Sequence, residues 1–215
     1  NLRELRNQVG LVFQYPEHQL FEVNVLQDVC FGPKNQGLSP EECEKRAREA
    51  LQLVGLKEKY FDHSPFDLSG GQKRRAAIAG VLAMRPKVLV LDEPTAGMDA
   101  FARRQMWNLL KKLNQQKLTI LLTTHYMEEA ETLCDRVGFM CGGRLEETDA
   151  PGHMIETLGR YAVDETSPDG LKSHYFHGKE EAIQYLSASE QETALRSTTL
   201  EDVFLETIGQ QLECR

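Results

Sequence analysis

The sequence predicts an α/β fold with a mostly parallel sheet, and three observations support this prediction. Residues 88–93 form an apolar run that ends in two adjacent carboxylates, which is typical of a buried parallel strand with polar groups at its carboxyl end. A second apolar run, residues 118–122, predicts another buried strand, and two threonines and His125 follow it. Residues 70–84 form an alanine-rich helical stretch before the first run. Strands that alternate with helices pair in parallel, so both polar ends should lie at one edge of the sheet.

The composition is that of a globular chain. Its 215 residues are 40% hydrophobic and 27% charged, which predicts one domain with a core and a small appendage. Because no apolar run is long enough to span a membrane and no signal peptide is visible, we expect a cytoplasmic protein, at most peripheral at the inner face of the cell membrane. The net charge of −8 argues against nucleic acid as a partner. The five cysteines form no C-x-x-C pair, so reduced packing thiols are expected.

The first segments alternate between helix and strand. Residues 1–6 are expected to be the end of a helix, and residues 9–13 a short apolar strand that ends at Gln14. Taken alone, Gln14 is compatible with an ordinary loop residue. Residues 25–31 predict a short helix, and the glycine and proline that follow should stop it.

The next helix has a clear start. Ser39 is expected to cap it, a proline stands at its first position, and Glu42 completes a capping box. Apolar residues then recur at helical spacing until Gly55 closes the element. Residues 15–64 are therefore expected to be a helical insertion, which forms a helical subdomain of residues 15–84 with the helix that follows.

The segment Leu-Ser-Gly-Gly-Gln, residues 68–72, opens the alanine-rich helix. Ser69 and the two glycines leave free backbone N–H groups and the positive end of the helix dipole directed at one point, which suits an anion. An ordinary N-cap with a flexible turn is the alternative. Lys73, Arg74 and Arg75 follow where cations oppose the helix dipole, so acidic neighbours or a bound anion should compensate them. A solvated basic face is the other interpretation.

The second half of the chain continues with helices and a hairpin. Asp99 is expected to cap a helix over residues 101–116, in which Trp107 is a core or interface residue. An acidic helix over residues 127–134 and a hairpin over residues 136–148 follow. The remaining residues predict an α+β appendage with helices from 151, over 179–186 and over 199–210, and strands near 161–164, 173–177 and 193–196.

Together these motifs resemble an ABC-type ATPase. Residues 68–72 resemble its signature motif, residues 88–94 its Walker B strand, and residues 96–99 its D-loop. Residues 13–16 (Phe-Gln-Tyr-Pro) resemble the Q-loop, and His125 occupies the place of the switch histidine.

Two subfamilies share the resemblance. Residues 9–21 and 31–35 are especially similar to the ATPases of energy-coupling-factor vitamin and metal importers. Residues 123–136 and 199–205 instead resemble the exporter-type ATPases of drug, polysaccharide and nodulation-factor transporters. The second resemblance predicts an exporter, whereas residues 9–35 are the part expected to face the membrane subunit.

The resemblance implies an N-terminally truncated, P-loop NTPase-like ABC ATPase domain over residues 1–150 and an accessory region over residues 151–215. ATP and Mg²⁺ are the implied cofactors. Asp92 would hold Mg²⁺, Glu93 would polarise the attacking water, His125 would steady the γ-phosphate, and Gln14 would approach the magnesium and the water. The interface of a head-to-tail dimer would use Leu68, Ser69, Gly70, Gly71, Gln72 and Asp99.

No stretch of the sequence matches G-x-x-x-x-G-K-[ST], the phosphate cradle. Gly178-Lys179 is followed by Glu180 and lies in the appendage. We therefore expect the chain alone to be inactive and to leave the strand that ends at Asp92 with an unpaired edge. The complete domain would hydrolyse ATP and work with transmembrane permease subunits and a second ABC subunit, which is either the same or a different chain.

Two other function classes are considered. A non-transport ABC protein is disfavoured because the sequence has no long heptad run, no zinc-type cysteine pairing and no basic surface. A non-hydrolysing regulatory or partner subunit is the second alternative. The sequence does not indicate the transported substrate.

Overall fold

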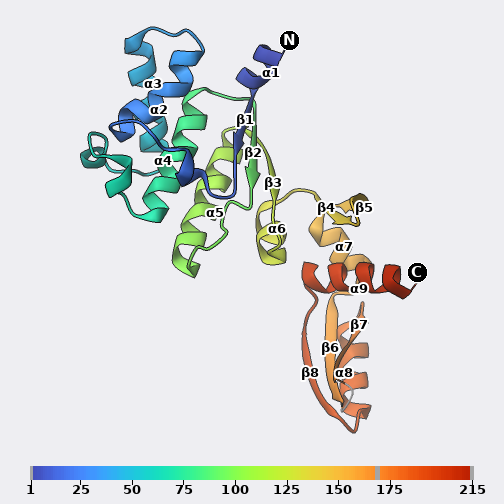
Figure 1. Cartoon of the computed structure of the whole chain (residues 1–215). Coiled ribbons are helices and arrows are strands. Elements are labelled where there is room, and N and C mark those ends of the chain that lie inside the picture. Colours follow the sequence, from blue (N-terminus) through green and yellow to red (C-terminus); the bar gives the residue numbers. More distant parts are fainter. Residues whose placement is uncertain (1, 168–169, 214–215) are drawn as a thin grey trace. The chain divides into compact units, whose positions relative to one another are not determined.

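The computed structural model describes residues 2–167 and 170–213, and it divides the chain into two compact units, Asn1–His125 and Tyr126–Arg215. The first unit contains a parallel sheet with helices, and the second contains two antiparallel sheets with helices (Figure 1). The sequence prediction of an α/β fold with a parallel sheet is therefore confirmed. The domain boundary expected after residue 150 stays a prediction.

The sheet of the first unit has the strand order β1-β2-β3, with all strands parallel. The strands are β1 (Val9–Val12), β2 (Val88–Asp92) and β3 (Thr119–Thr123). Leu89 and Leu91 of the central strand are fully buried. Asp92 lies opposite Thr123 in the register, so the carboxyl ends of β2 and β3 lie side by side.

Strand β3 differs from the expectation of a buried strand. It lies at an edge of the sheet, and the Leu121 side chain is 60% exposed. The expectation that the strand ending at Asp92 has an unpaired edge was wrong, because β1 and β3 pair with β2 on both sides. An open edge of this sheet, with an exposed leucine on it, therefore belongs to β3.

The helical subdomain consists of α2, α3 and α4, which pack against one another. Its core contains the fully buried side chains of Val29, Leu51, Phe61 and Ile78. The non-strand elements of the first unit are α1 (Leu2–Gln8), η1 (Pro16–Gln19), α2 (Val25–Asn35), α3 (Pro40–Leu53), η2 (Glu58–Tyr60), η3 (Pro65–Asp67), α4 (Gly70–Ala83) and α5 (Ala100–Gln115).

Helix α2 continues through Gly32 and Pro33 to Asn35, so the predicted stop was wrong. A proline in the last turn removes only its own N–H, which would have bonded the carbonyl four residues earlier. Gly32 is required by packing, because a Cβ at this position would lie 2.6 Å from Cγ of Met84 on the neighbouring helix. The glycine therefore allows α2 and the end of α4 to approach each other closely.

The capping box formed at a different helix from the one predicted. The Ser39 hydroxyl accepts the Glu42 N–H at 3.3 Å, but the Glu42 carboxylate pairs with Arg46 at 2.7 Å, so only half of the box forms. At α4 both halves are present. The Ser69 hydroxyl accepts the Gln72 N–H at 3.4 Å, and the Gln72 side chain accepts the Ser69 N–H at 2.9 Å.

The second unit confirms the predicted order of helices and strands, with most elements slightly longer. Its three-stranded antiparallel sheet has the order β7-β6-β8. Its core contains Ala130, Phe139, Met154, Leu200 and Val203. The elements are α6 (Met127–Leu133), β4 (Val137–Cys141), β5 (Arg144–Asp149), α7 (Pro151–Leu158), β6 (Tyr161–Ser167), β7 (Gly170–Phe176), α8 (Lys179–Ala188), β8 (Glu192–Ser197) and α9 (Leu200–Glu213).

An ion-pair network joins the sheet of the second unit to α9. Arg196 of β8 donates to both Asp164 of β6 and Asp202 of α9, with a shortest distance of 2.7 Å to each. Hydrogen bonding to Arg196 lowers the pKa of Asp164. Burial raises the pKa of Asp202, but hydrogen bonds from Arg196 and Thr199 outweigh burial and lower it overall. Both aspartates are therefore held in the charged form.

Replacing Arg196 with methionine is expected to lower the free energy of unfolding by about 2–3 kcal/mol, because two neighbouring carboxylates lose their cation. Because both folded pKa values are lowered, this stabilisation is present above about pH 4 and is lost as the pH falls through the folded values. Urea unfolding followed by circular dichroism at several pH values measures the difference.

The control is Arg160→Met, which removes only a surface pair with Glu156 and should change the free energy of unfolding by less than about 0.5 kcal/mol. If Arg196→Met lowers the free energy of unfolding no more than this control does, or if its effect does not shrink at low pH, the stabilising role of the Arg196 ion pairs is contradicted.

Candidate functional site

Three polar side chains from three strand ends meet at the carboxyl edge of the parallel sheet. The Gln14 amide nitrogen donates to Oε2 of Glu93 at 2.6 Å, and Nδ1 of His125 lies 3.2 Å from the other oxygen, Oε1. Each side chain follows a different strand, β1, β2 or β3. The sequence prediction that these ends converge is confirmed. The Glu93 side chain is 27% exposed and that of His125 is 60% exposed, so the cluster opens to solvent.

The backbone at Glu93 takes an uncommon conformation that turns the chain away from the sheet. Its φ is +43°, in the left-handed region, which costs a non-glycine residue about 1–2 kcal/mol. The Glu93 N–H donates to the carbonyl of Thr123 at 3.1 Å. The Thr123 hydroxyl donates to Asp92 Oδ1 at 2.6 Å. Thr123, the last residue of β3, therefore holds both carboxylate residues, a role that sequence reasoning missed.

The donor set at this edge fits a magnesium ion that is shared with phosphate. Asp92 and Glu93 supply hard carboxylate oxygens, and Mg²⁺ typically binds through one or two carboxylates together with phosphate oxygens and water. In the part of the chain that the structure describes, no group of three or more histidine, cysteine, aspartate or glutamate side chains is arranged to hold a metal by itself. The remaining ligands would come from water and phosphate.

Arg74 connects the signature helix to the site, and sequence reasoning did not single it out. Its side chain is buried in the first turns of α4 and donates to the carbonyls of Gln14 and Ala96, each at 2.9 Å. Its Nε lies 3.5 Å from the Glu17 carboxylate. The interpretation as a solvated basic face is therefore wrong for Arg74, because backbone carbonyls and the Glu17 carboxylate compensate its positive charge. Its burial could have been predicted from the sequence, because Arg74 lies four residues before the buried Ile78 and so shares its face of the helix.

The signature segment presents an open surface at the start of α4. Ser69 and Gln72 bond to each other's backbone in the capping box. A Cβ built at Gly70 or Gly71 would have no neighbour within 4 Å, so packing inside the described chain does not require these glycines. Asp99 accepts the Ala102 N–H at 2.9 Å and caps α5, as predicted.

Comparison with known proteins finds one family to which this chain is similar. Residues 1–96 match the model of the ABC transporter family. The energy-coupling factor transporter ATP-binding protein EcfA2 of Streptococcus pneumoniae is 52% identical over 158 residues, which are 74% of this chain and 57% of that protein. Over most of its length this chain is therefore similar to ATP-binding proteins of the ABC transporter family. The EcfA2 protein of Streptococcus pyogenes is 55% identical over 157 residues, 73% of this chain and 56% of that protein.

Solved structures agree with this assignment. The cbiO1 protein of Clostridium perfringens, part of the ABC transporter complex cbiONQ, matches with a TM-score of 0.65 and 42% identity, covering 69% of this chain and 59% of that one. The ATP-binding cassette MJ0796, solved as a dimer bound to ADP and Pi, matches with a TM-score of 0.60 and 32% identity. The match covers 69% of this chain and 66% of that one. The chain thus spans a little over half the length of the curated ABC ATPases that it matches.

The geometry gives the side chains at this sheet edge distinct chemical capacities. A carboxylate that accepts a hydrogen bond from an amide and lies against an imidazole is oriented to take a proton from water. In the described residues of the chain, no hydrogen bond or ion pair joins residues 68–72 to Asp92 or Glu93.

Replacing His125 with alanine, in a version of the chain that also carries a P-loop segment, is expected to lower kcat about a hundredfold and KM much less. The imidazole contacts the Glu93 carboxylate and should act on the reacting groups more than on substrate binding. Steady-state ATPase kinetics measure the split. His153→Ala is the matched control, because His153 is also exposed and paired with a carboxylate, Asp149. A pure KM effect would return His125 to a structural role.

Proposed function

We propose that this chain is part of the ATP-binding and ATP-hydrolysing subunit of an ABC transporter, which couples hydrolysis to solute movement through separate transmembrane subunits. The contact of Gln14 and His125 with the two oxygens of Glu93 is the observation that supports it most directly. The family match and the names of the relatives support the same function.

In the proposed mechanism each residue at the sheet edge has a separate task. Mg²⁺ bound with ATP would supply charge neutralisation at the phosphates. Asp92, fixed by Thr123, would hold the ion through its carboxylate, usually by way of water. Glu93 would accept a proton from the attacking water, and Gln14 and His125 would orient that water and Glu93.

A second ABC subunit would complete the site. Gly70 and Gly71 are exposed at the start of α4, where free N–H groups and the helix dipole favour an anion. Because no described hydrogen bond joins this segment to Asp92 or Glu93 of the same chain, we expect these N–H groups to serve ATP held by the second subunit. Asp99, at the start of α5, would lie in the same interface.

The permease would bind at a groove beside the Q-loop. A cavity of about 530 Å³ lies between η1, α2 and α4 and is lined in part by Phe21, Phe31 and Met84. The Phe21 side chain is 58% exposed and that of Phe31 is 43% exposed, and their rings meet edge to face at 4.9 Å. Exposed aromatic pairs of this kind suit a protein partner. The subunit would accordingly lie at the inner face of the cell membrane.

The direction of transport stays a prediction. Residues 199–205 predict an exporter, whereas the relatives described above are named as energy-coupling factor ATPases. Co-purification of the transmembrane partner decides between the two. Association with a coupling-factor membrane protein and a vitamin-binding subunit would exclude the exporter.

The experiment that tests the function adds this chain to an ABC subunit that contains a P-loop and measures phosphate release. We expect release to rise when the chain is added, because its signature segment completes the site of the other subunit. Gly71→Glu should abolish the stimulation by repelling phosphate, and there is room for the new side chain. The matched control is Gly152→Glu, which places the same charge at the second residue of helix α7. If the Gly71→Glu chain still stimulates phosphate release, a non-hydrolysing regulatory role of this chain is favoured.

A further inference from the structure

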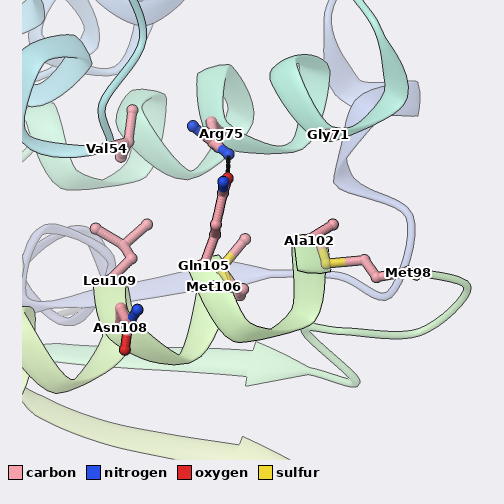
Figure 2. A pocket seen from close by; sticks show the side chains of 9 residues that line it. All are labelled: Val54, Gly71, Arg75, Met98, Ala102, Gln105, Met106, Asn108 and Leu109. Carbon is pink, nitrogen blue, oxygen red and sulfur yellow. Dashed lines mark hydrogen bonds between the residues drawn. The ribbon is translucent and has the colours of Figure 1, made fainter. Parts of the chain in front are cut away.

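A cavity of about 300 Å³ lies between helices α4 and α5, and the proposed ATPase mechanism does not use it. Figure 2 shows the Arg75 side chain reaching from α4 to the Gln105 side chain of α5, to which its guanidinium donates a hydrogen bond. Met98 and Met106 line the same space, and Gly71 of the signature segment forms part of its wall.

The cavity carries one positive charge. Arg75 is the charged residue among the described residues that line it, and no aspartate or glutamate is among them. No described carboxylate forms an ion pair with Arg75, whose guanidinium bonds a neutral amide, whereas Arg46 and Arg85 each pair with a glutamate. A guanidinium that faces a cavity without a carboxylate is suited to bind an anion, and its fork geometry matches a carboxylate.

Two methionines of the lining favour an aromatic group, beside the polar side chains of Gln105 and Asn108. Thioether sulfurs make favourable contacts with aromatic rings, and Met98 and Met106 place two of them around the space (Figure 2). A dry apolar cavity of about 150 Å³ is enough for a benzene ring. The volume found here therefore leaves room for a ring together with a short acidic side chain.

We propose that this cavity binds a small aromatic carboxylate, with its carboxylate on Arg75 and its ring between Met98 and Met106. The site is separate from the Gln14, Glu93 and His125 cluster. Its occupant would lie against Gly71, at the start of the signature helix. The proposal concerns binding alone, so it stands or fails independently of ATP hydrolysis.

The test is a titration of the ¹⁵N-labelled 215-residue chain with phenylacetate, followed by amide chemical shifts in the absence of nucleotide. We expect saturable shifts at Gly71, Ala102 and Gln105. Phenylacetamide, which has nearly the same shape but no charge, should bind about tenfold more weakly, because a hydrogen bond to a charged group is lost. Cyclohexylacetate, which keeps the charge and lacks the ring, should also bind more weakly. Equal affinity for the acid and the amide, or shifts that do not saturate, would overturn the proposal.

Variants locate the site within the chain. Arg75→Gln should weaken phenylacetate binding about tenfold, and Arg75→Lys should weaken it less. Ala102→Leu should block binding by filling the space without changing any charge. The control is Arg104→Gln, the same charge change at an exposed position of α5 that does not line the cavity. If Arg75→Gln does not fold, the comparison of Ala102→Leu with Arg104→Gln decides. Binding that survives Ala102→Leu would place the ligand elsewhere.

Discussion

Replacing Glu93 with glutamine, in a version of the chain that also carries a P-loop segment, is expected to abolish multiple-turnover ATP hydrolysis while ATP binding remains. Glutamine keeps the shape of the side chain and can still bond Gln14, but it cannot accept a proton from water. General-base catalysis typically contributes about 10²–10⁴-fold, so the loss should be of this order. It should appear in kcat, because the base acts in the chemical step.

The measurement pairs steady-state phosphate release with equilibrium binding of Mg-ATP by the same preparation. Glu128→Gln is the matched control, because Glu128 is an exposed glutamate at the start of α6 and belongs to the other compact unit of the chain. Turnover of Glu93→Gln near the parent rate would defeat the assignment of the base. A parallel loss of binding would point instead to a damaged fold.

The second large effect concerns the 215-residue chain by itself, which we expect neither to bind Mg-ATP tightly nor to hydrolyse it. A P-loop supplies several charged hydrogen bonds to phosphate, and each such interaction is typically worth about 1.5–3 kcal/mol. Without them, affinity should fall by several orders of magnitude. Asp92 and Glu93 are present, but two carboxylates repel phosphate unless a metal lies between them.

Isothermal titration calorimetry of the chain with Mg-ATP tests this expectation, and the version with a P-loop segment is the positive control. Submicromolar affinity, or steady phosphate release without another subunit, would contradict it. We also expect the isolated chain to associate, because the edge of β3 is open and its Leu121 side chain is 60% exposed. Light scattering before the titration measures this association.

Local patterns predicted most of the fold. The alternation of helix and strand predicted the parallel sheet, and the polar strand ends placed Glu93 and His125 together, whereas the resemblance to a Q-loop placed Gln14 beside them. This inference worked because parallel strands bring all their carboxyl ends to one edge, so a residue's position after a strand fixes its place in space. Caps such as Asp99 were equally accessible, since they depend on neighbours within one turn.

The features that were missed depend on contacts distant in sequence. Arg74 was one of three consecutive cations, and only the packing of α4 on the Q-loop buries it. The prediction that α2 stops at Gly32 was wrong because this glycine does not form a turn. It allows close packing against Met84, which lies fifty-two residues later. Strand β3 was expected to be buried because its composition is apolar, but its exposure depends on which strands are present beside it.

The contacts of Arg74 have a mechanical consequence. Arg74 belongs to α4, and its guanidinium donates hydrogen bonds to the carbonyls of Gln14 and Ala96, which belong to the segments after β1 and β2. A rotation of α4 over the sheet would either break these hydrogen bonds or move the Gln14 backbone together with the helix. Because the Gln14 amide is bonded to Glu93, a small rotation of the helical subdomain would displace the Glu93 carboxylate. Arg74 would thus transmit a movement of the helices to the Glu93 side chain.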